Sequence, residues 1–394
     1  MGDSKLTTEK STRFWKYGLV VFISFLIFSF GYGLGSGNIK FGTKSSDGKL
    51  PANLSYQSVE EVYDSLRTQY DGELDEISLL SGLKKGLVEA AGDPYTEFLT
   101  AEQTQEFDED LNGTFSGIGA ELSKKDDSIV IVSPINGFPA EREGLKPNDV
   151  ILEIDGESAY GLSVSEAVDK IRGQVGTQVQ LKVLREDGDK SFTITRENIT
   201  IPSVESKVID GNIGYIEISR FSDDTAELVR SAAEDFKSQN VKGVIVDVRG
   251  NPGGLLDAAV DVSSVWLDKG DVVLEEKSGD KTIRTYNANG NSILGGIPTV
   301  VLINEGSASA SEILAGALND NGAATLIGQK SFGKGSVQTI ERFSDGSSLK
   351  VTIARWYTPN GNNIDKQGIE PNTAIEQSEN PDVDSQLQAA IDSL

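Results

Sequence analysis

The residues with the clearest potential for chemistry are three serines, Ser307, Ser309 and Ser311, in the stretch Gly306-Ser-Ala-Ser-Ala-Ser-Glu312. Before them, Thr299 to Ile303 is a β-branched apolar run that is long enough for a buried strand. From Ser309 onward the apolar residues recur at helical spacing. A small Ser-rich turn therefore joins a strand to a helix N-terminus, where a nucleophile can be exposed and backbone N–H groups point at the group it attacks.

The composition limits which group could activate such a serine. The chain of 394 residues contains no histidine and no cysteine, so Ser-His-Asp and Cys-His catalysis are excluded. Lys334 is the candidate base, and the glycines on both sides of it allow close backbone approach. Gln338 follows four residues later and shares the face of Lys334 in either a strand or a helix.

The same residues also have a purely structural interpretation. Ser309-Ala-Ser-Glu312 is a capping box, with Ser309 as the N-cap and Glu312 at the third helical position. Taken alone, a Ser-rich helix start followed by a Gly-Lys-Gly turn is structural more often than catalytic. Further motifs must decide between the two interpretations.

Two further motifs accompany the serine stretch, namely Asp247-Val-Arg-Gly-Asn-Pro-Gly-Gly254 and Phe332-Gly-Lys-Gly-Ser-Val-Gln338. Together the three resemble the carboxyl-terminal processing (tail-specific) peptidases, which are Ser/Lys proteases with a PDZ domain. The resemblance implies that Ser309 is the nucleophile, that Lys334, 25 residues later, is the general base, and that Gln338 supports it. Ser307 and Ser311 then have turn and helix roles.

The glycines of the second motif have two interpretations. In one, Pro252 and the glycines simply start a helix. In the other, the N–H of Gly253 or Gly254 pairs with that of Ala310 to form an oxyanion hole, where losing one donor typically costs about 3 kcal/mol. The sequence does not decide which glycine it would be.

A lysine base needs a lowered pKa, because an ordinary lysine with a pKa near ~10.4 is only about 0.04% neutral at pH 7. Burial in an apolar pocket lowers it, and the expected walls are Val337, Phe332 and the strand residues around Ile303. Gln338 can orient the amine without adding a charge that would keep it protonated.

Residues 113–197 are predicted to form short strands, one helix from Ser165 to Ile171 and Asn-Gly and Asp-Gly turns. The resemblance implies that this region is the PDZ domain, and the stretch from Ala140 to Gly156 is similar to the PDZ pattern. Ser116-Gly-Ile-Gly-Ala120 resembles the carboxylate-binding loop, in which successive backbone N–H groups form an anion nest. We expect Ser116, Gly117, Ile118 and Gly119 to bind a peptide C-terminus by β-augmentation. Arg172, at the end of the helix, is either a sensor of the incoming carboxylate or a residue that favours its helix C-terminus.

The N-terminal region predicts a membrane anchor. Residues 1–16 form a polar, partly basic head, residues 17–36 an apolar stretch long enough to span a bilayer, and residues 37–53 a linker. A cleaved signal peptide is the alternative, but no Ala-x-Ala site follows the apolar run. With the resemblance, this places a single-pass protein in the cell membrane, with its catalytic body extracytoplasmic.

The rest of the chain predicts three parts. Residues 54–112 form a helical region, and residues 198–376 alternate strands and helices, as in an α/β core. The tail, 377–394, ends in a short helix. The resemblance implies a core of the crotonase and ClpP type with the PDZ domain inserted, and a homodimer through the N- and C-terminal regions.

The composition also bears on ligands. A net charge of −25 argues against nucleic-acid binding. Without histidine or cysteine a zinc site is not expected, and no calcium-loop spacing is present, so we predict no metal and no cofactor. A carboxylate site for a hard cation stays open.

The predicted function is a membrane-anchored serine endopeptidase that recognises apolar C-termini of protein substrates through its PDZ domain. It would cleave peptide bonds through an acyl-enzyme. The alternatives are a catalytically inactive PDZ scaffold and a non-proteolytic acyl hydrolase that uses the same dyad.

Overall fold

The computed structural model describes residues 56–185, 187–378, 380 and 382–394. The chain divides into two compact units, residues 1–76 and 77–394. The described part of the first unit contains helix α2 (Tyr56–Gln69). The predicted head, membrane anchor and linker lie outside the described residues, and none of the helices from residue 56 onward is long and apolar enough to cross a membrane.

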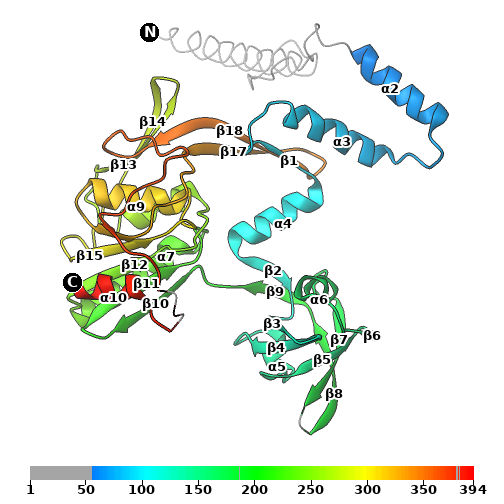
Figure 1. The fold of residues 1–394 in the computed structure, drawn as a ribbon, viewed down its shortest axis with the longest axis horizontal. Coiled ribbons are helices and arrows are strands. Elements are labelled where there is room, and N and C mark those ends of the chain that lie inside the picture. The colour runs from blue at the N-terminus through cyan, green and yellow to red at the C-terminus, as the bar shows by residue number, and fades with distance from the viewer. Residues whose placement is uncertain (1–55, 186, 379, 381) are drawn as a thin grey trace, which may run out of the picture. The chain divides into compact units, whose positions relative to one another are not determined.

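The second unit is built around a six-stranded sheet in the order β10-β11-β12-β15-β16-β19. Four of these strands, β10, β11, β12 and β15, are labelled in Figure 1. β10 is antiparallel to β11, and the other neighbouring strands are parallel. Every residue of β12 and β15 is buried, and for β15 this confirms the buried strand predicted at Thr299 to Ile303. The strands are β10 (Val204–Ile209), β11 (Ile213–Ile218), β12 (Gly243–Asp247), β15 (Thr299–Ile303), β16 (Thr325–Gly328) and β19 (Thr373–Ala374).

Helices cover both faces of this sheet, which confirms the predicted α/β core. One face packs against α7 (Thr225–Gln239), α8 (Leu256–Ser263) and α9 (Ala310–Asp320). The other face packs against α10 (Ser385–Asp392), the helix predicted for the tail. Successive strand residues point to opposite faces, so Val244 and Val246 belong to one core and Ile245 to the other.

A second sheet of this unit has the order β1-β18-β13-β14, with β17 paired to β18. Within the helical region predicted for residues 54–112, Glu97–Leu99 forms the short strand β1 between two helices. β1 pairs with β18 and so joins a segment before the PDZ region to this sheet. The elements are α3 (Glu76–Glu89), β1, α4 (Ala101–Asn112), β13 (Val272–Ser278), β14 (Lys281–Asn287), β17 (Ser336–Arg342) and β18 (Ser348–Tyr357).

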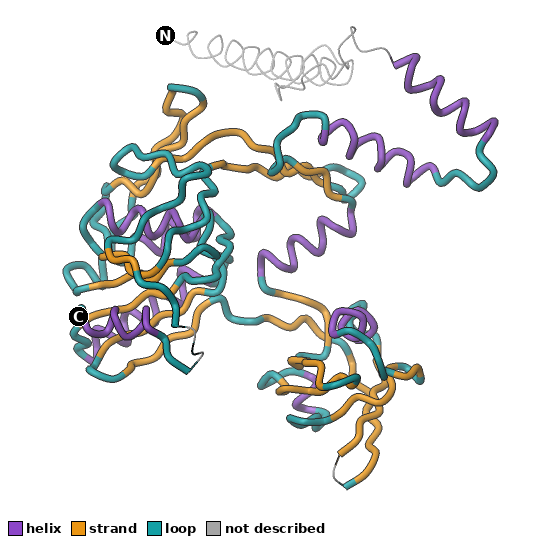
Figure 2. The backbone as a smooth tube through the Cα atoms, in the orientation of Figure 1, coloured by secondary structure: helices purple, strands orange, loops and turns teal. Residues whose placement is uncertain are grey.

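The PDZ region has a hydrophobic core of its own. A two-stranded ribbon of β2 (Thr114–Gly117) and β9 (Glu197–Thr200) brings its entry and exit side by side (Figure 2). The sheet order is β3-β4-β5-β7-β8, with β6 paired to β5. Its elements are β3 (Ala120–Lys125), β4 (Ser128–Pro134), α5 (Pro139–Arg142), β5 (Val150–Ile154), β6 (Glu157–Ser158), α6 (Val164–Ile171), β7 (Gln178–Arg185) and β8 (Gly188–Thr195).

Candidate active site

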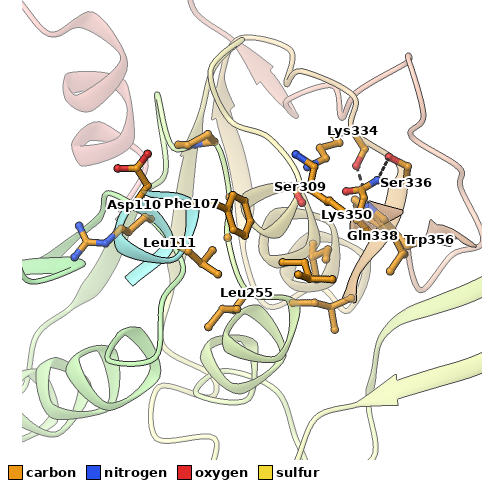
Figure 3. Close-up of a pocket in the computed structure, with 18 residues that line it drawn as sticks. Phe107, Asp110, Leu111, Leu255, Ser309, Lys334, Ser336, Gln338, Lys350 and Trp356 are labelled. Carbon is orange, nitrogen blue, oxygen red and sulfur yellow. Dashed lines mark hydrogen bonds between the residues drawn. The ribbon is translucent and has the colours of Figure 1, made fainter. Parts of the chain in front are cut away.

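Three adjacent parallel strands, β12, β15 and β16, send their carboxyl-terminal loops to the same edge of the main sheet. Ligands of open α/β sheets bind at such an edge. The three predicted motifs occupy these three loops, and together they line one cavity of about 380 Å³ (Figure 3). Its lining includes Gly253, Gly254, Ser309, Lys334 and Gln338.

Ser309 has a backbone that few residues other than glycine adopt, with φ 53° and ψ −112°. Such a conformation costs of order 1–3 kcal/mol and persists only where the surroundings enforce it. Helix α9 begins at the next residue, and the Ser309 N–H donates to the Glu312 carboxylate at 2.8 Å, which is the Glu312 half of the predicted capping box. Capping and exposure of a nucleophile are therefore compatible at this position.

The other two serines of the stretch are engaged in structural hydrogen bonds. The Ser307 hydroxyl donates to the Val248 carbonyl at 2.7 Å, and the Ser311 hydroxyl donates to the Asn251 carbonyl at 3.0 Å. Both serines are fully buried, and neither lines the cavity. Their predicted turn and helix roles are confirmed.

Asn251 joins the glycine loop to the serine loop. Its carbonyl accepts from the Ala308 N–H and from the Ser311 hydroxyl, both at 3.0 Å. Its side-chain amide donates to the Ile218 carbonyl at 2.7 Å, and its side-chain oxygen accepts from the Gly253 N–H at 2.8 Å. The backbone carbonyl of Asn251 therefore joins the two loops, and its buried side chain holds the glycine loop against the end of β11.

The two candidate oxyanion glycines differ in the use of their N–H groups. The Gly253 N–H is already bonded to Asn251. Gly254 forms an isolated bridge with Phe221, and the hydrogen bonds of this bridge use the N–H groups of Phe221 and Leu255. The N–H of Gly254 itself has no partner among the described residues. Ala310 opens α9, and its N–H likewise has none there. Gly253 is in turn packed so tightly that an added Cβ would lie 2.8 Å from the Ser309 Cβ.

The backbone of Lys334 is held from both sides. Its N–H donates to the Glu312 carboxylate at 2.9 Å, and its carbonyl accepts from the indole Nε1–H of Trp356 at 3.0 Å (Figure 3). Its neighbour Gly335 leaves no room for a side chain, because a Cβ there would lie 2.5 Å from the Asp365 nitrogen. The Lys334 segment therefore has one tightly defined path.

Glu312 connects the candidate nucleophile to the candidate base. Its buried carboxylate accepts four hydrogen bonds, from the N–H groups of Ser309, Gly333 and Lys334 and from the Ser331 hydroxyl. Burial raises the pKa of the Glu312 carboxyl, and these bonds oppose that rise. In the sequence Glu312 was visible only as a helix cap.

The pKa of the Lys334 amine is lowered, as a general base requires. Burial lowers its pKa, the charge of Lys350 lowers it further, and Glu312 raises it. Val337 lines the cavity as predicted, but Phe332 is 58% exposed and lines none of it. The prediction of Phe332 as a wall is therefore wrong, and so is that of Ile303, which lies in the core behind the site. Phe107 and Leu111 of α4 line the cavity instead.

Gln338 lies on β17, which begins just after Lys334. Its amide nitrogen donates to the hydroxyls of Ser336 at 2.7 Å and Thr352 at 3.2 Å. With both donors used, the carbonyl oxygen is the atom left to accept a hydrogen bond from an amine. No hydrogen bond joins Ser309, Lys334 and Gln338 directly among the described residues, although all three line the cavity.

The PDZ region has a groove of about 100 Å³ lined by Gly117, Ile118, Gly119, Arg172 and the apolar side chains of Leu122, Val168 and Ile171. The N–H groups of Ile118 and Gly119 have no partner among the described residues, as an anion nest requires. The guanidinium of Arg172 lies over the Phe115 ring at 4.9 Å. Ser116, which was predicted to bind the peptide, is not in the lining, and its hydroxyl donates to the Gly173 carbonyl.

Family models match this chain in two places, one over the region of the candidate active site and one over the PDZ region. The model of peptidase family S41 matches residues 212–375, and the PDZ domain model matches residues 116–195. The chain is 40% identical over 324 residues to the carboxy-terminal processing protease CtpA of Bacillus subtilis, covering 82% of this chain and 69% of that protein.

Two further similarities are to a second curated protein and to a solved structure. A CtpA-like serine protease of Staphylococcus haemolyticus is 41% identical over 321 residues, with 81% of this chain and 64% of that protein covered. The solved structure of a photosystem II D1 C-terminal processing protease is 30% identical and superposes with a TM-score of 0.50, covering 82% of this chain and 87% of that one.

Proposed function

This chain belongs to the carboxy-terminal processing proteases of peptidase family S41, and from this premise we propose that it hydrolyses peptide bonds with a Ser309–Lys334 dyad. One observation carries the proposal. A single cavity combines a strained, accessible serine, a lysine whose pKa is lowered by burial, and Gly254, whose backbone N–H has no partner among the described residues. Ala310 follows the serine directly and is buried beside the cavity, outside its lining.

The chemistry follows from these groups. Neutral Lys334 accepts the Ser309 proton while Ser309 Oγ attacks the substrate carbonyl and forms a tetrahedral intermediate. The peptide C–N bond then breaks, the departing amine takes the proton from Lys334, and the acyl-enzyme that remains is hydrolysed by water. The N–H groups of Gly254 and Ala310 hold the oxyanion, since the N–H of Gly253 is committed to Asn251. The Gln338 carbonyl orients the Lys334 amine without adding a formal charge.

Substrate capture is proposed for the PDZ groove. The N–H groups of Ile118 and Gly119 would bind the terminal carboxylate, and Leu122, Val168 and Ile171 favour an apolar last residue. Ser116 acts indirectly here, by bonding the segment that follows Arg172. Protein substrates with free apolar C-termini are therefore the proposed class.

We also propose that the protein is anchored in the cell membrane by residues 17–36, with its catalytic body outside the cytoplasm. The support is the apolar, charge-free sequence of that stretch. Homodimerisation is proposed through the N-terminal helices, because Val62 of α2 is 61% exposed and Ile77 and Leu87 of α3 are 76% and 65% exposed.

The direct test uses the protein without its first 53 residues and an unfolded protein that ends in apolar residues. We expect cleavage products by mass spectrometry, and slower cleavage when the substrate ends in Asp-Asp. Ser309→Ala is the control for a contaminating protease. Binding of the C-terminal peptide without any cleavage would instead identify an inactive scaffold.

A further inference from the structure

A second amine reaches the same cavity from the strand beside Gln338. Lys350 of β18 lies directly opposite Ile340 of β17, and Thr352 lies opposite Gln338. Residues directly opposite each other, and residues two apart on one strand, share a face of a sheet. The register therefore places Lys350 on the cavity face, one pair along from Gln338, and Lys350 lines the cavity together with Lys334 (Figure 3).

Lys350 is held in place by two contacts from the segment before the PDZ region. Glu97 of β1 lies opposite it in the register, and its carboxylate is 3.2 Å from the Lys350 amine. The ring of Phe107 in α4 lies 5.6 Å from the same amine. The Lys350 side chain is only 24% exposed, whereas that of Glu97 is 54% exposed.

We propose that Lys350 is a positioning residue that acts electrostatically through Lys334, keeping the base neutral, and that Glu97 sets how much of this charge Lys334 senses. The proposal rests on the proposed role of Lys334 as the base. A lysine beside another cation loses its proton more readily, because the protonated forms repel each other.

The groups around Lys334 have opposite effects on its pKa. Glu312 of α9 contributes a negative charge that favours the protonated amine. The ring of Tyr95, 5.7 Å away, also favours a cation. Lys350 is the cation that opposes both, and burial acts in the same direction. Asp110 and Arg220 also line the cavity and contribute one charge of each sign.

The sign of the effect is opposite for the two partners. Removing the charge of Lys350 raises the pKa of Lys334, so the rise of activity with pH moves to higher pH. Removing the charge of Glu97 leaves Lys350 uncompensated, which lowers the pKa of Lys334 and moves the rise to lower pH. If the Lys350–Glu97 ion pair were purely structural, both variants would lose activity.

The experiment measures kcat/KM against pH, with a small acyl ester as substrate, for Lys350→Met and Glu97→Gln. We expect Lys350→Met to be slower by about three- to tenfold at pH 7 and to recover most of the loss at high pH. Glu97→Gln should be faster than the parent at pH 7. Added salt should reduce both differences, because it screens partly exposed charges.

Lys84→Met is the matched control, because Lys84 also pairs with a carboxylate, that of Asp345 at 2.7 Å, and also lies over a ring, that of Phe98 at 5.0 Å, but outside the cavity. Its pH profile should match that of the parent. If Lys350→Met lowers the rate equally at every pH, or if both variants shift the profile in the same direction, the proposal is wrong. Full activity in Lys334→Ala would instead contradict the dyad itself.

Discussion

At the scale of single residues, the candidate site depends on groups that are held by their backbones rather than by bonds between their side chains. Ser309 and Lys334 both donate their backbone N–H to the Glu312 carboxylate. Their side chains therefore stay available for chemistry while their positions are fixed. Such preorganisation is where much of the rate enhancement of enzymes originates.

Ser309→Ala and Lys334→Ala should each lower kcat by at least about 10³-fold, since residues that act as a unit fail together. Gln338→Ala should cost less, about ten- to a hundredfold, because it orients the amine without reacting. Circular dichroism and peptide binding should be unchanged in all three. An inactive Ser311→Ala combined with an active Ser309→Ala would mean that the nucleophile is misassigned.

The pH dependence follows from the lowered pKa of Lys334. Only the neutral amine can accept the serine proton, so kcat/KM should rise with pH and level off above that pKa. The midpoint should lie below the ~10.4 of an ordinary lysine. With no histidine in the chain, an imidazole cannot explain the rise. A rate that does not vary between pH 5 and 9 would contradict a lysine base.

Sequence reasoning at this scale depended on residue types and motif spacing. Residue types and spacing predicted Ser309 and Lys334, and the absence of histidine reduced the number of side chains that could be the general base. Sequence reasoning could not find Asn251 or Trp356, because their roles arise from contacts between segments far apart in the chain. Nor could it choose between Gly253 and Gly254, because the choice depends on the hydrogen bond from the Gly253 N–H to the Asn251 side chain.

At the scale of elements, three parallel strands deliver the three motifs to one edge. The apolar run at Thr299 to Ile303 predicted β15, and the helical spacing predicted α9 with its N-cap at Ser309. The second sheet was harder to predict, since β1 and β18 pair across the whole PDZ region. Such pairing leaves no local pattern in a three-residue strand.

Trp356→Phe tests whether β18 positions the base. It removes the indole N–H that bonds the Lys334 carbonyl at 3.0 Å and keeps an aromatic ring. We expect kcat to fall about tenfold with KM nearly unchanged, since the amine would lose its alignment. Steady-state kinetics on a peptide substrate measure both constants.

Trp266→Phe is the control for stability alone. Trp266 is also buried, and its indole N–H donates to the Thr299 hydroxyl at 3.0 Å, away from the cavity. Each variant should lose about 1–3 kcal/mol of unfolding free energy, the usual cost of an unsatisfied buried partner. Equal kinetic losses in the two variants would show that Trp356 contributes stability only.

At the scale of the whole molecule, the β2–β9 ribbon makes the PDZ region an insertion with adjacent ends. A protease with a broad cleft needs protection from cutting folded neighbours. We propose that the PDZ region blocks the cavity until a C-terminus binds in its groove. The bound C-terminus would shift the population toward the arrangement in which the cavity is open, and Arg172 would sense its carboxylate. Its guanidinium already lies in the groove, over the Phe115 ring.

Arg172→Ala should therefore weaken the stimulation of cleavage by C-terminal peptides and leave the hydrolysis of a small ester unchanged. Deleting residues 113–197 should keep or raise the ester activity. A folded deletion protein that is inert toward the ester would mean that the PDZ region builds the site instead of gating it. Rate measurements with and without peptide decide between these outcomes.

The central claim is that Ser309 is a nucleophile activated by Lys334. The most direct measurement is the rate of labelling by a serine-reactive phosphonate at pH 7, with the labelled residue identified by mass spectrometry. The account predicts a single label on Ser309 and a rate at least about 10³-fold lower in Lys334→Ala. A label on Ser307 or Ser311, or an unchanged rate in Lys334→Ala, would contradict it.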